Sequence, residues 1–412
     1  MKHLLLNELV TVLESGSRPK GGVRAGTGEV LSLGAEHLSE HGDLDLSKAK
    51  RIPQSFFEVM GSGRVEVDDI LIVKDGATTG RTALIRPDPV VVKAAINEHV
   101  FRLRINFQLA LPSYVFHFLR SATGQSQVLS DFRGATVGGI SRGFVDRVKL
   151  PVPSLKEQGR IVAILDTADA IRRKRRESLL LFEQFSKAAF AQLVGSQNRN
   201  YSKWPEYRLV ELAESTPDAI RTGPFGSALR HSEFVDSGVA VLGIDNAVQN
   251  RFAWAERRFI PTEKYSAFRR YTVKPGDVIV TIMGTTGRSA VVPDSVPLAI
   301  STKHLAVITV DRRRVIPQFL SFAFHSDQSV LMQIAASNRG AIMAGLNLGL
   351  IKRLRVRVPP LEEQERFANI VSSVGLAVER VHQACIEADR LFTSLNQWMF
   401  NGPFQVVNGN VI

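Results

Sequence analysis

VPSLKEQGRIVAIL, which begins at Val152, returns near the other end of the chain as VPPLEEQERFANIV, which begins at Val358. The two starting points lie 358 − 152 = 206 residues apart, half the length of the 412-residue chain. Both copies have proline at their second position (Pro153, Pro359) and a glutamate four residues later (Glu157, Glu363), a pattern typical of the start of a helix. The chain is therefore expected to use one structural unit twice.

The repeat continues upstream of these helix starts. RGATVGGISRGFVDRVKLPVP, from Arg133, matches RGAIMAGLNLGLIKRLRVRVP, from Arg339, at the same spacing. VDDILIVKDGATTGR (67–81) similarly corresponds to KPGDVIVTIMGTTGR (274–288). The spacing between these copies differs slightly from 206 residues, which loops of unequal length explain. In both, an acid precedes a β-branched run that ends in glycine and threonine, which predicts a buried strand followed by a tight turn.

Each repeated entrance is expected to open a long helix. Apolar residues recur every three or four positions from Phe367 to Met399, and in the first copy from Ile161 to Leu193, where Arg175 interrupts the stripe. A helix over residues 154–193 would be ~60 Å long. Two such helices bury their apolar stripes most simply against each other, as an antiparallel coiled-coil pair. The residues predicted at this helix-pair or partner interface are Ile161, Ile164, Ile171, Leu179, Phe182, Phe367, Ile370, Val374, Val381, Leu391 and Leu395.

The predicted fold class is α+β, with two mixed α/β domains joined by two long antiparallel coiled-coil helices in a pseudo-two-fold internal repeat. The polar stretch VGSQNRNYSKWPEY (194–207) is expected to end the first helix and lead into the second domain. The predicted segments are a first domain at 1–153, a first helix with linker at 154–197, a second domain at 198–359, a second helix at 360–402 and a tail at 403–412.

Composition favours a partner rich in phosphate. The formal net charge is +12 and the pI is about 10.0, a balance that favours nucleic acid over a membrane surface. No window approaches the roughly 20 apolar residues that span a bilayer, and MKHLLLNELV reaches polar residues too early for a signal peptide. A cytoplasmic protein is expected. The single Cys385 excludes an internal disulfide and a cysteine cluster for zinc.

Candidate DNA-binding residues lie at the turns and in the loops that differ between the halves. Arg133 and Arg339 match across the repeat, so contact with phosphate, which positions a protein without specifying sequence, or a purely structural role fits them better than base reading. Cations in the divergent stretches SGSRPKGGVRAGTGE (15–29) and IRTGPFGSALRHSEFVDSG (220–238) are the better candidates for contacts with bases. A purely structural role is the alternative at the glycine and threonine turns. The predicted set is Lys20, Arg24, Lys74, Thr78, Thr79, Arg81, Arg133, Arg142, Arg221, Arg230, Thr285, Thr286, Arg288 and Arg339.

Recognisable catalytic motifs are missing from the sequence. It contains no Gly-x-x-x-x-Gly-Lys phosphate loop, no adenine-methylase motif and no common nuclease motif. His37-Leu-Ser-Glu-His41 matches the H-x-x-E-H pattern of a zinc protease class, but that pattern requires a helix and here follows strand-like sequence. No catalytic residue, no metal site and no cofactor are therefore predicted in this chain.

The basic run Arg172-Arg173-Lys174-Arg175-Arg176 lies inside the first predicted helix. Clustered cations bind DNA by releasing counterions from phosphates. A solvated helix face, or contact with an acidic partner subunit, explains the run equally well, so its role stays open at this point.

The sequence resembles the specificity subunit (HsdS) family of type I restriction-modification systems. The resemblance rests on the two VPxLxEQ entrances, each followed by a long helix and preceded by a Gly-Arg strand-turn and an RGA segment, and it covers essentially residues 1–402. It implies two target-recognition domains that read the halves of a bipartite, asymmetric site in double-stranded DNA. It also implies helices that dock two methyltransferase subunits, which carry S-adenosylmethionine and methylate adenine. Whether a restriction and translocase subunit joins them is left open.

Two other functions remain as alternatives on the sequence alone. One is a DNA-modifying enzyme whose catalytic motif is not recognisable. The other is a non-catalytic coiled-coil scaffold that binds proteins only, with its positive charge serving solubility.

Overall fold

The computed structural model describes residues 2–23, 28–47, 49–87, 93–134, 138–225, 229–254, 256–337, 345–401, 406–407 and 410–411. The chain forms two compact units: unit 1 comprises Met1–Arg176 with Gln383–Ile412, and unit 2 comprises Glu177–His382. Each long helix gives one half to each unit. The domain boundaries predicted from the sequence set the helices apart as segments of their own, whereas the compact units cut through them.

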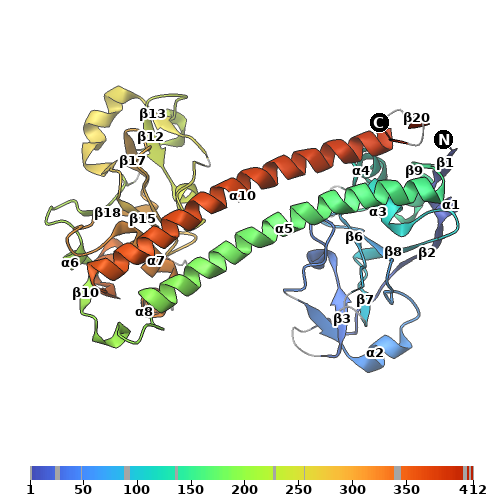
Figure 1. The fold of residues 1–412 in the computed structure, drawn as a ribbon, viewed down its shortest axis with the longest axis horizontal. Coiled ribbons are helices and arrows are strands. Elements are labelled where there is room, and N and C mark those ends of the chain that lie inside the picture. Colours follow the sequence, from blue (N-terminus) through green and yellow to red (C-terminus); the bar gives the residue numbers. More distant parts are fainter. Residues whose placement is uncertain are drawn as a thin grey trace. The chain divides into compact units, whose positions relative to one another are not determined.

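Two long helices, α5 (Leu155–Leu193) and α10 (Leu361–Asn401), are the green and red ribbons of Figure 1. Both begin where the repeated sequence predicts. The Ser154 hydroxyl caps α5 by accepting a hydrogen bond from the Glu157 amide at 3.3 Å. Within the described part of the chain, no helix is both long and apolar enough to cross a lipid bilayer.

Unit 1 combines small sheets with helices. Strand β1 (Lys2–Leu5) pairs antiparallel with β9 (Lys149–Val152), the strand that leads into α5. One sheet has the order β2–β8–β5–β6, with β2 (Val10–Ser15), β8 (Val100–Ile105), β5 (Ile70–Val73) and β6 (Thr82–Leu84). The other has the order β4–β3–β7, with β4 (Lys50–Ile52), β3 (Val30–Leu33) and β7 (Ala94–Ile96), and β3 lies parallel to β7. The helices are α1 (Leu6–Leu9), η1 (Ala35–His37), α2 (Gln54–Val59), α3 (Pro112–Arg120), α4 (Ala122–Leu129) and η3 (Arg142–Asp146).

Unit 2 repeats this topology and adds one strand, β14, to its second sheet. Strand β10 (Glu206–Arg208) pairs antiparallel with β19 (Arg355–Arg357), the strand that leads into α10. One sheet has the order β11–β18–β15–β16, with β11 (Ile220–Thr222), β18 (Leu305–Ile308), β15 (Val278–Thr281) and β16 (Ser289–Val291). The other has the order β13–β12–β17–β14, with β13 (Phe259–Ile260), β12 (Val239–Leu242), β17 (Ala299–Ser301) and β14 (Thr272–Val273). The helices are η4 (Tyr201–Lys203), α6 (Leu209–Leu212), η6 (His231–Glu233), η7 (Ile244–Asn246), η8 (Thr262–Tyr271), α7 (Pro317–Ser326), α8 (Gln328–Ser337) and α9 (Leu348–Arg353). The matching topologies confirm the internal repeat.

The glutamine of each VPxLxEQ entrance explains why the motif recurs. Gln158 is fully buried; its Oε1 accepts from the Leu111 amide at 2.8 Å and its Nε2 donates to the Leu109 carbonyl at 3.1 Å. Gln364 does the same in unit 2, accepting from the Ile316 amide at 2.8 Å. Each glutamine therefore fastens the loop before α3 or α7 to the first turn of its long helix.

The two helices pack antiparallel, as predicted. In unit 1 the first half of α5 shares a core with the second half of α10, where Ile161 and Leu165 meet Phe392 and Met399. In unit 2 the second half of α5 meets the first half of α10, and the rings of Phe190 and Phe367 lie 5.4 Å apart. The fold class predicted from the sequence is confirmed.

The buried face of the helices is rotated from part of the predicted stripe. Ile161 and Phe367 are buried as expected, but Ile164, Ile171 and Leu391 are 39%, 45% and 57% exposed. The helix pair instead buries the next residue along: Leu165, Arg172 and Phe392. The physical reason is the Arg172 side chain, whose guanidinium carbon lies 4.2 Å from the centroid of the Phe392 ring. The remaining predicted residues are partly buried: Leu179, Phe182, Ile370, Val374, Val381 and Leu395.

The acid that precedes each β-branched run is buried, but the two units supply its arginine from different strands. In unit 1 the Asp69 carboxylate accepts from Arg102 and Arg104, both on β8, at 2.9 Å. In unit 2 Asp277 accepts from Arg221, on β11, at 2.7 Å. The strand of unit 1 that corresponds to β11 carries Glu14, which binds Arg102 at 2.5 Å. The position of Glu14 is thus taken by Arg221 in unit 2, and the position of Arg102 is taken by Val307.

Candidate nucleic-acid interface

In unit 1 the predicted glycine and threonine turn joins β5 to β6. Gly76 and Gly80 adopt positive φ angles of 93° and 86°, which glycine tolerates best. The Thr79 hydroxyl donates to the Gly76 carbonyl at 2.7 Å, so Thr79 holds the turn itself. Arg81 follows the turn and is exposed, and Thr78 is half-buried. The turn therefore presents Arg81 outward, and Thr79 has a structural contact.

Lys74 lies at the start of this turn, close to the acidic side chain of Asp75. Its Nζ lies 3.9 Å from Asp75 Oδ2 and donates to the Glu98 carbonyl at 3.3 Å. Asp75 in turn bonds the imidazole Nδ1 of His99 at 2.5 Å. Lys74 is thus partly neutralised locally, unlike Arg81.

The RGA segment packs directly on the same turn. The Gly76 amide donates to the Gly138 carbonyl at 3.1 Å, and the Ile140 amide donates to the Lys74 carbonyl at 2.8 Å. The structure thereby brings two stretches that the sequence singled out into one place. Arg133 is 70% exposed there, and Arg142, at the start of η3, is exposed as well.

The Asp131 side chain holds the RGA segment of unit 1 in place. Its carboxylate is buried and accepts from the amide and the hydroxyl of Ser141 at 2.7 and 2.6 Å. Burial acts to raise the pKa of Asp131, but the Ser141 hydrogen bonds and the nearby Arg133 and Arg147 outweigh it and lower the pKa. A charged Asp131 thus fixes the loop from which Arg133 projects.

Unit 2 builds the corresponding turn between β15 and β16. Gly284 and Gly287 have φ angles of 74° and 83°, and the Arg288 amide donates to the Thr281 hydroxyl at 3.0 Å. Arg288 and Thr285 are exposed, and Thr286 is half-buried. Gly345 pairs with Met283, which lies at the start of this turn. The predicted residue Arg339 lies outside the described residues.

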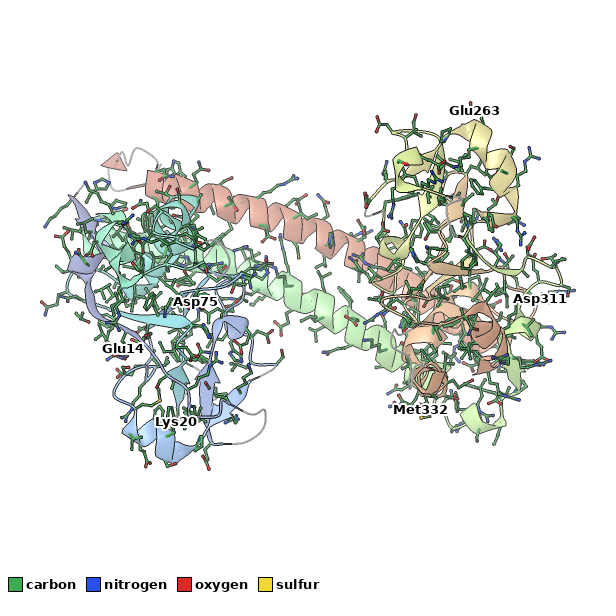
Figure 2. All side chains as sticks on the ribbon, turned by 180° about the vertical axis from the view of Figure 1, so that it is seen from behind. Glu14, Lys20, Asp75, Glu263, Asp311 and Met332 are labelled. Atoms are coloured by element: carbon green, nitrogen blue, oxygen red, sulfur yellow. The ribbon has the colours of Figure 1, made fainter. Side chains whose placement is uncertain are left out.

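The loops predicted to read bases have different outcomes. Lys20 is exposed in the loop after β2, marked in Figure 2, and Arg230 is exposed just before η6. Arg24 lies outside the described residues. Arg221 is 8% exposed and donates to Asp277, to the Thr272 carbonyl and to the Thr309 hydroxyl. Its guanidinium is occupied inside the domain, which leaves Arg221 a poor candidate for contact with a base.

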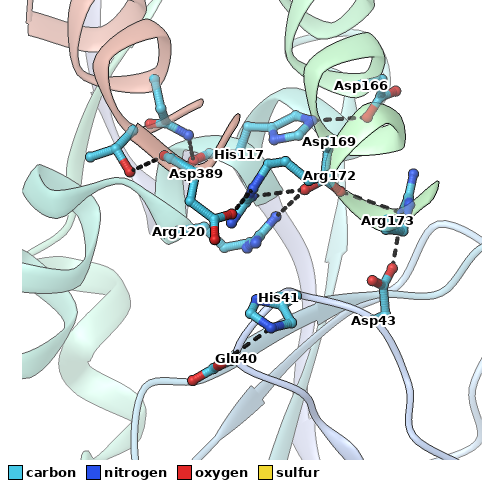
Figure 3. Close-up of polar contacts among 12 residues, drawn as sticks. Glu40, His41, Asp43, His117, Arg120, Asp166, Asp169, Arg172, Arg173 and Asp389 are labelled. Carbon is cyan, nitrogen blue, oxygen red and sulfur yellow. Dashed lines mark hydrogen bonds and ion pairs between the residues drawn. The ribbon is translucent and has the colours of Figure 1, made fainter. Parts of the chain in front are cut away.

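The basic run of α5 is engaged within unit 1 (Figure 3). Arg172 donates from Nη1 to Asp169 at 3.0 Å and from Nε to Asp389 on α10 at 2.7 Å. Arg173 donates to Asp43, in the loop after η1, at 2.9 Å. Arg176 also reaches Asp389, at 2.7 Å. These arginines therefore tie α5 to α10 and to the sheet domain, and the acids they meet were not identified from the sequence.

A second polar pair lies beside this network. His117, buried on α3, bonds Asp166 on α5 through Nε2 at 2.9 Å. Burial lowers the pKa of His117 despite the opposing effect of Asp166. Arg120, at the end of α3, lies 3.7 Å from Asp169. The contacts of α3 with α5 are thus polar as well as apolar.

The zinc-protease pattern His37–His41 does not form a helix face. The short 3₁₀ helix η1 ends at His37, whose Nδ1 accepts from the Gly34 amide at 2.9 Å, and His41 pairs with its neighbour Glu40 at 3.1 Å. Among the residues that the structure describes, no three or more His, Cys, Asp or Glu side chains gather in a way that suits a metal ion.

The sequence profile described as "Type I restriction modification DNA specificity domain" matches residues 6–181 and 241–388. These ranges cover most of the chain. The chain belongs to this family. The family assigned from the two VPxLxEQ entrances is therefore confirmed.

Named members of the type I specificity family resemble the chain along most of its length. The MjaVIII specificity subunit of Methanocaldococcus jannaschii is 20% identical over 362 residues, which cover 84% of this chain and 81% of that protein. The EcoBI specificity subunit of Escherichia coli is 23% identical over 326 residues, covering 74% of this chain and 64% of that protein.

Solved structures share the fold. A crystal structure of a type I restriction-modification S subunit from M. genitalium has a TM-score of 0.56 and 13% identity, and covers 97% of this chain and 96% of that one. A chain from a study of complex assembly and conformational transition in the type I system has a TM-score of 0.51 and 16% identity, and covers 97% of each chain. At these identities the likeness establishes the fold alone.

Proposed function

We propose that the chain is the DNA sequence-specificity subunit of a type I restriction-modification complex and that its two units each read one half of a bipartite, asymmetric target. The observation that carries this proposal is a repeated topology with unlike loops. Arg81 and Arg288 occupy equivalent exposed positions and are suited to phosphate. Lys20 and Arg230 lie in loops that differ between the units, which suits the reading of different bases.

The long helices are proposed to dock two methyltransferase subunits, with a restriction subunit as a further candidate partner. Large apolar side chains remain exposed on α5 within unit 2, including Leu180, Leu181 and Phe185. Exposed apolar side chains of this size are typical of protein interfaces. S-adenosylmethionine would bind in the partner, which flips and methylates the adenine, while this chain holds the DNA and catalyses nothing itself.

The test is an exchange of residues 1–150 for the corresponding domain of another family member. Methylated sites are then mapped in cells that carry the methyltransferase partner. The expected result is a change in one half of the recognised sequence with the other half unchanged. A change in both halves, or in neither, would contradict the proposal.

A second test of the proposed function uses the purified chain alone. It is expected to bind duplex DNA with an affinity that falls as salt rises, and to transfer no methyl group from S-adenosylmethionine. Methyl transfer by the chain alone would favour the alternative of a DNA-modifying enzyme. Failure to bind DNA, alone or with its partner, would favour a protein-only scaffold.

A further inference from the structure

Unit 2 contains a pocket of about 500 Å³, and Arg288 is the one lining residue to which the proposed function gives a role. Its walls come from α5, α10, the loop after η7, the residue Arg288 and the end of α7. Apolar side chains such as Phe182, Phe322 and Val374 line much of it. A pocket of this size and polarity is typical of sites for small molecules.

Comparison with unit 1 through the internal repeat explains why the side chains of unit 2 leave this pocket open. Positions on α5 and α10 correspond at a distance of 206 residues, and three wall positions of unit 2 carry smaller or less polar side chains than their counterparts in unit 1. The corresponding pairs are Ser186 and Phe392, Gly375 and Asp169, and Val378 and Arg172. In unit 1 all three counterparts are buried and in mutual contact, since Arg172 lies over the Phe392 ring and binds Asp169.

The side chains that unit 2 lacks relative to unit 1 indicate which ligand groups the pocket would accept. Relative to unit 1 it has lost a phenyl ring, at Ser186, and a carboxylate, at Gly375. A Cβ atom placed on Gly375 would meet no heavy atom within 4 Å, so the space is open at that point. A ligand with an aromatic ring and a carboxylate would supply both missing groups.

The polar groups of the pocket suit an anion. Lys187, Arg251 and Arg288 line it, whereas among the described lining residues the single acid is Glu183, which already pairs with Lys187 at 2.6 Å. The net charge of the lining is therefore positive.

His325 is placed to receive the carboxylate. It lies eight residues after the proline that starts α7, as Arg120 lies eight residues after the proline that starts α3. Arg120 approaches the carboxylate of Asp169 in unit 1. The Nε2 atom of His325 is buried with no hydrogen-bond partner among the described residues, while Nδ1 bonds the Ser326 hydroxyl at 3.0 Å. When Ser326 donates to Nδ1, Nε2 carries the hydrogen and can donate it to a ligand.

We propose that this pocket binds a small aromatic carboxylate, whose ring takes the place that Phe392 has in unit 1 and whose carboxylate faces His325. The inference stands on the internal repeat and the pocket and does not depend on DNA binding. An aromatic and an acidic side chain of a partner protein would carry the same chemistry, but the buried Nε2 atom of His325 favours a small free acid that can reach it.

The probe is 4-fluorophenylacetate, titrated with the full-length chain and followed by ¹⁹F NMR. Saturable binding is expected, and 4-fluorophenylacetamide, which has the same shape without the charge, should bind at least tenfold more weakly. Equal binding of acid and amide would overturn the assignment of the carboxylate. Absence of saturable binding by the acid would overturn the proposal and leave side chains of a partner as the occupant.

Variants of the lining residues test whether the acid binds in this pocket. Ser186→Phe restores the ring of unit 1 and should weaken binding of the acid at least tenfold. Gln184→Phe, on an exposed position of the same helix, is the matched control and should bind like the natural chain. Gly375→Asp supplies the missing carboxylate without filling the ring site, and should also weaken binding at least tenfold, so the test survives if Ser186→Phe does not fold. Unchanged affinity in a folded Ser186→Phe or Gly375→Asp chain would overturn the proposal.

Discussion

Arg172 on α5 donates to Asp389 on α10 across a distance of 2.7 Å between Nε and Oδ1. The same guanidinium lies over Phe392 and binds Asp169, so one arginine joins the two helices by charge and by ring contact. Arg172, which lies next to the predicted apolar stripe in sequence, thus strengthens the seam in three dimensions, because its stem is apolar and its head is paired.

Replacing Arg172 with Met should destabilise the chain by about 2–3 kcal/mol, because buried Asp169 then loses its closest cation while the apolar stem is kept. The exposed Asp389 contributes less, since water screens its charge. Urea unfolding provides the measurement. Lys156→Met, an exposed change near the start of the same helix, is the control and should stay within about 0.5 kcal/mol of the natural chain. Equal stability of both variants would refute a role for Arg172 in the seam.

Replacing Gln364 with Met should cost about 2–4 kcal/mol, because the Ile316 amide and the carbonyls of Arg314 and Pro359 lose their partner in a buried place. Hydrogen exchange at the Ile316 amide should accelerate. The neighbouring change Glu365→Met, at an exposed position, should leave that amide protected. If exchange is the same in both variants, Gln364 does not fasten the loop.

Acid should weaken unit 2 through His325. Burial, followed by the nearby cations Lys187 and Arg288, lowers the pKa of this imidazole from 6.5 to about 4. Between these values the unfolded chain binds a proton that the folded chain does not, so this group's contribution to stability falls as pH drops from 6.5 toward 4.

Unfolding free energies of the natural chain and His325→Gln, measured across this range, should converge as the pH falls. The difference isolates His325 from the carboxylates, which titrate in both proteins. A difference that stays constant with pH would show that His325 does not charge on unfolding.

Arg81→Gln should weaken DNA binding about equally for all sequences and reduce the slope of log affinity against log salt by about 1, because one phosphate contact is lost. Arg230→Gln should instead alter base preference in one half-site, with a penalty of about 1–3 kcal/mol for the natural base. Binding to a randomised duplex library at two salt concentrations separates the effects. A specificity change in Arg81→Gln would contradict its assignment to phosphate.

Deletion of seven residues from each of α5 and α10 should shorten the spacer tolerated between the two half-sites, because both helices run through both units. The deletions remove about two turns from each helix, so the apolar face is nearly preserved. Mapping of methylated sites reads out the spacer. An unchanged spacer would refute the idea that the helices set it.

Local patterns predicted much of this fold. The repeated helix starts, the long helices and the glycine turns depend on residues close in sequence, and the structure has them where the sequence indicates. The buried face of the helices was less predictable. Ile164 looks like a better core residue than Arg172 until the Phe392 ring is known to face Arg172. Arg221 shows the same limit: its partner Asp277 lies 56 residues away, and nothing near Arg221 in sequence indicates that it is buried.

The different strands that supply the arginine partners of Asp69 and Asp277 restrict how such genes can recombine. A crossover inside the sheet would set Glu14 near Asp277 with no arginine between them, or would crowd Arg221 against Arg102. A crossover at Pro153 or Pro359 keeps Asp69 with Arg102 and Asp277 with Arg221. Evolution can therefore shuffle this protein as whole modules, whereas mosaics within a module would inherit mismatched charges in their interior.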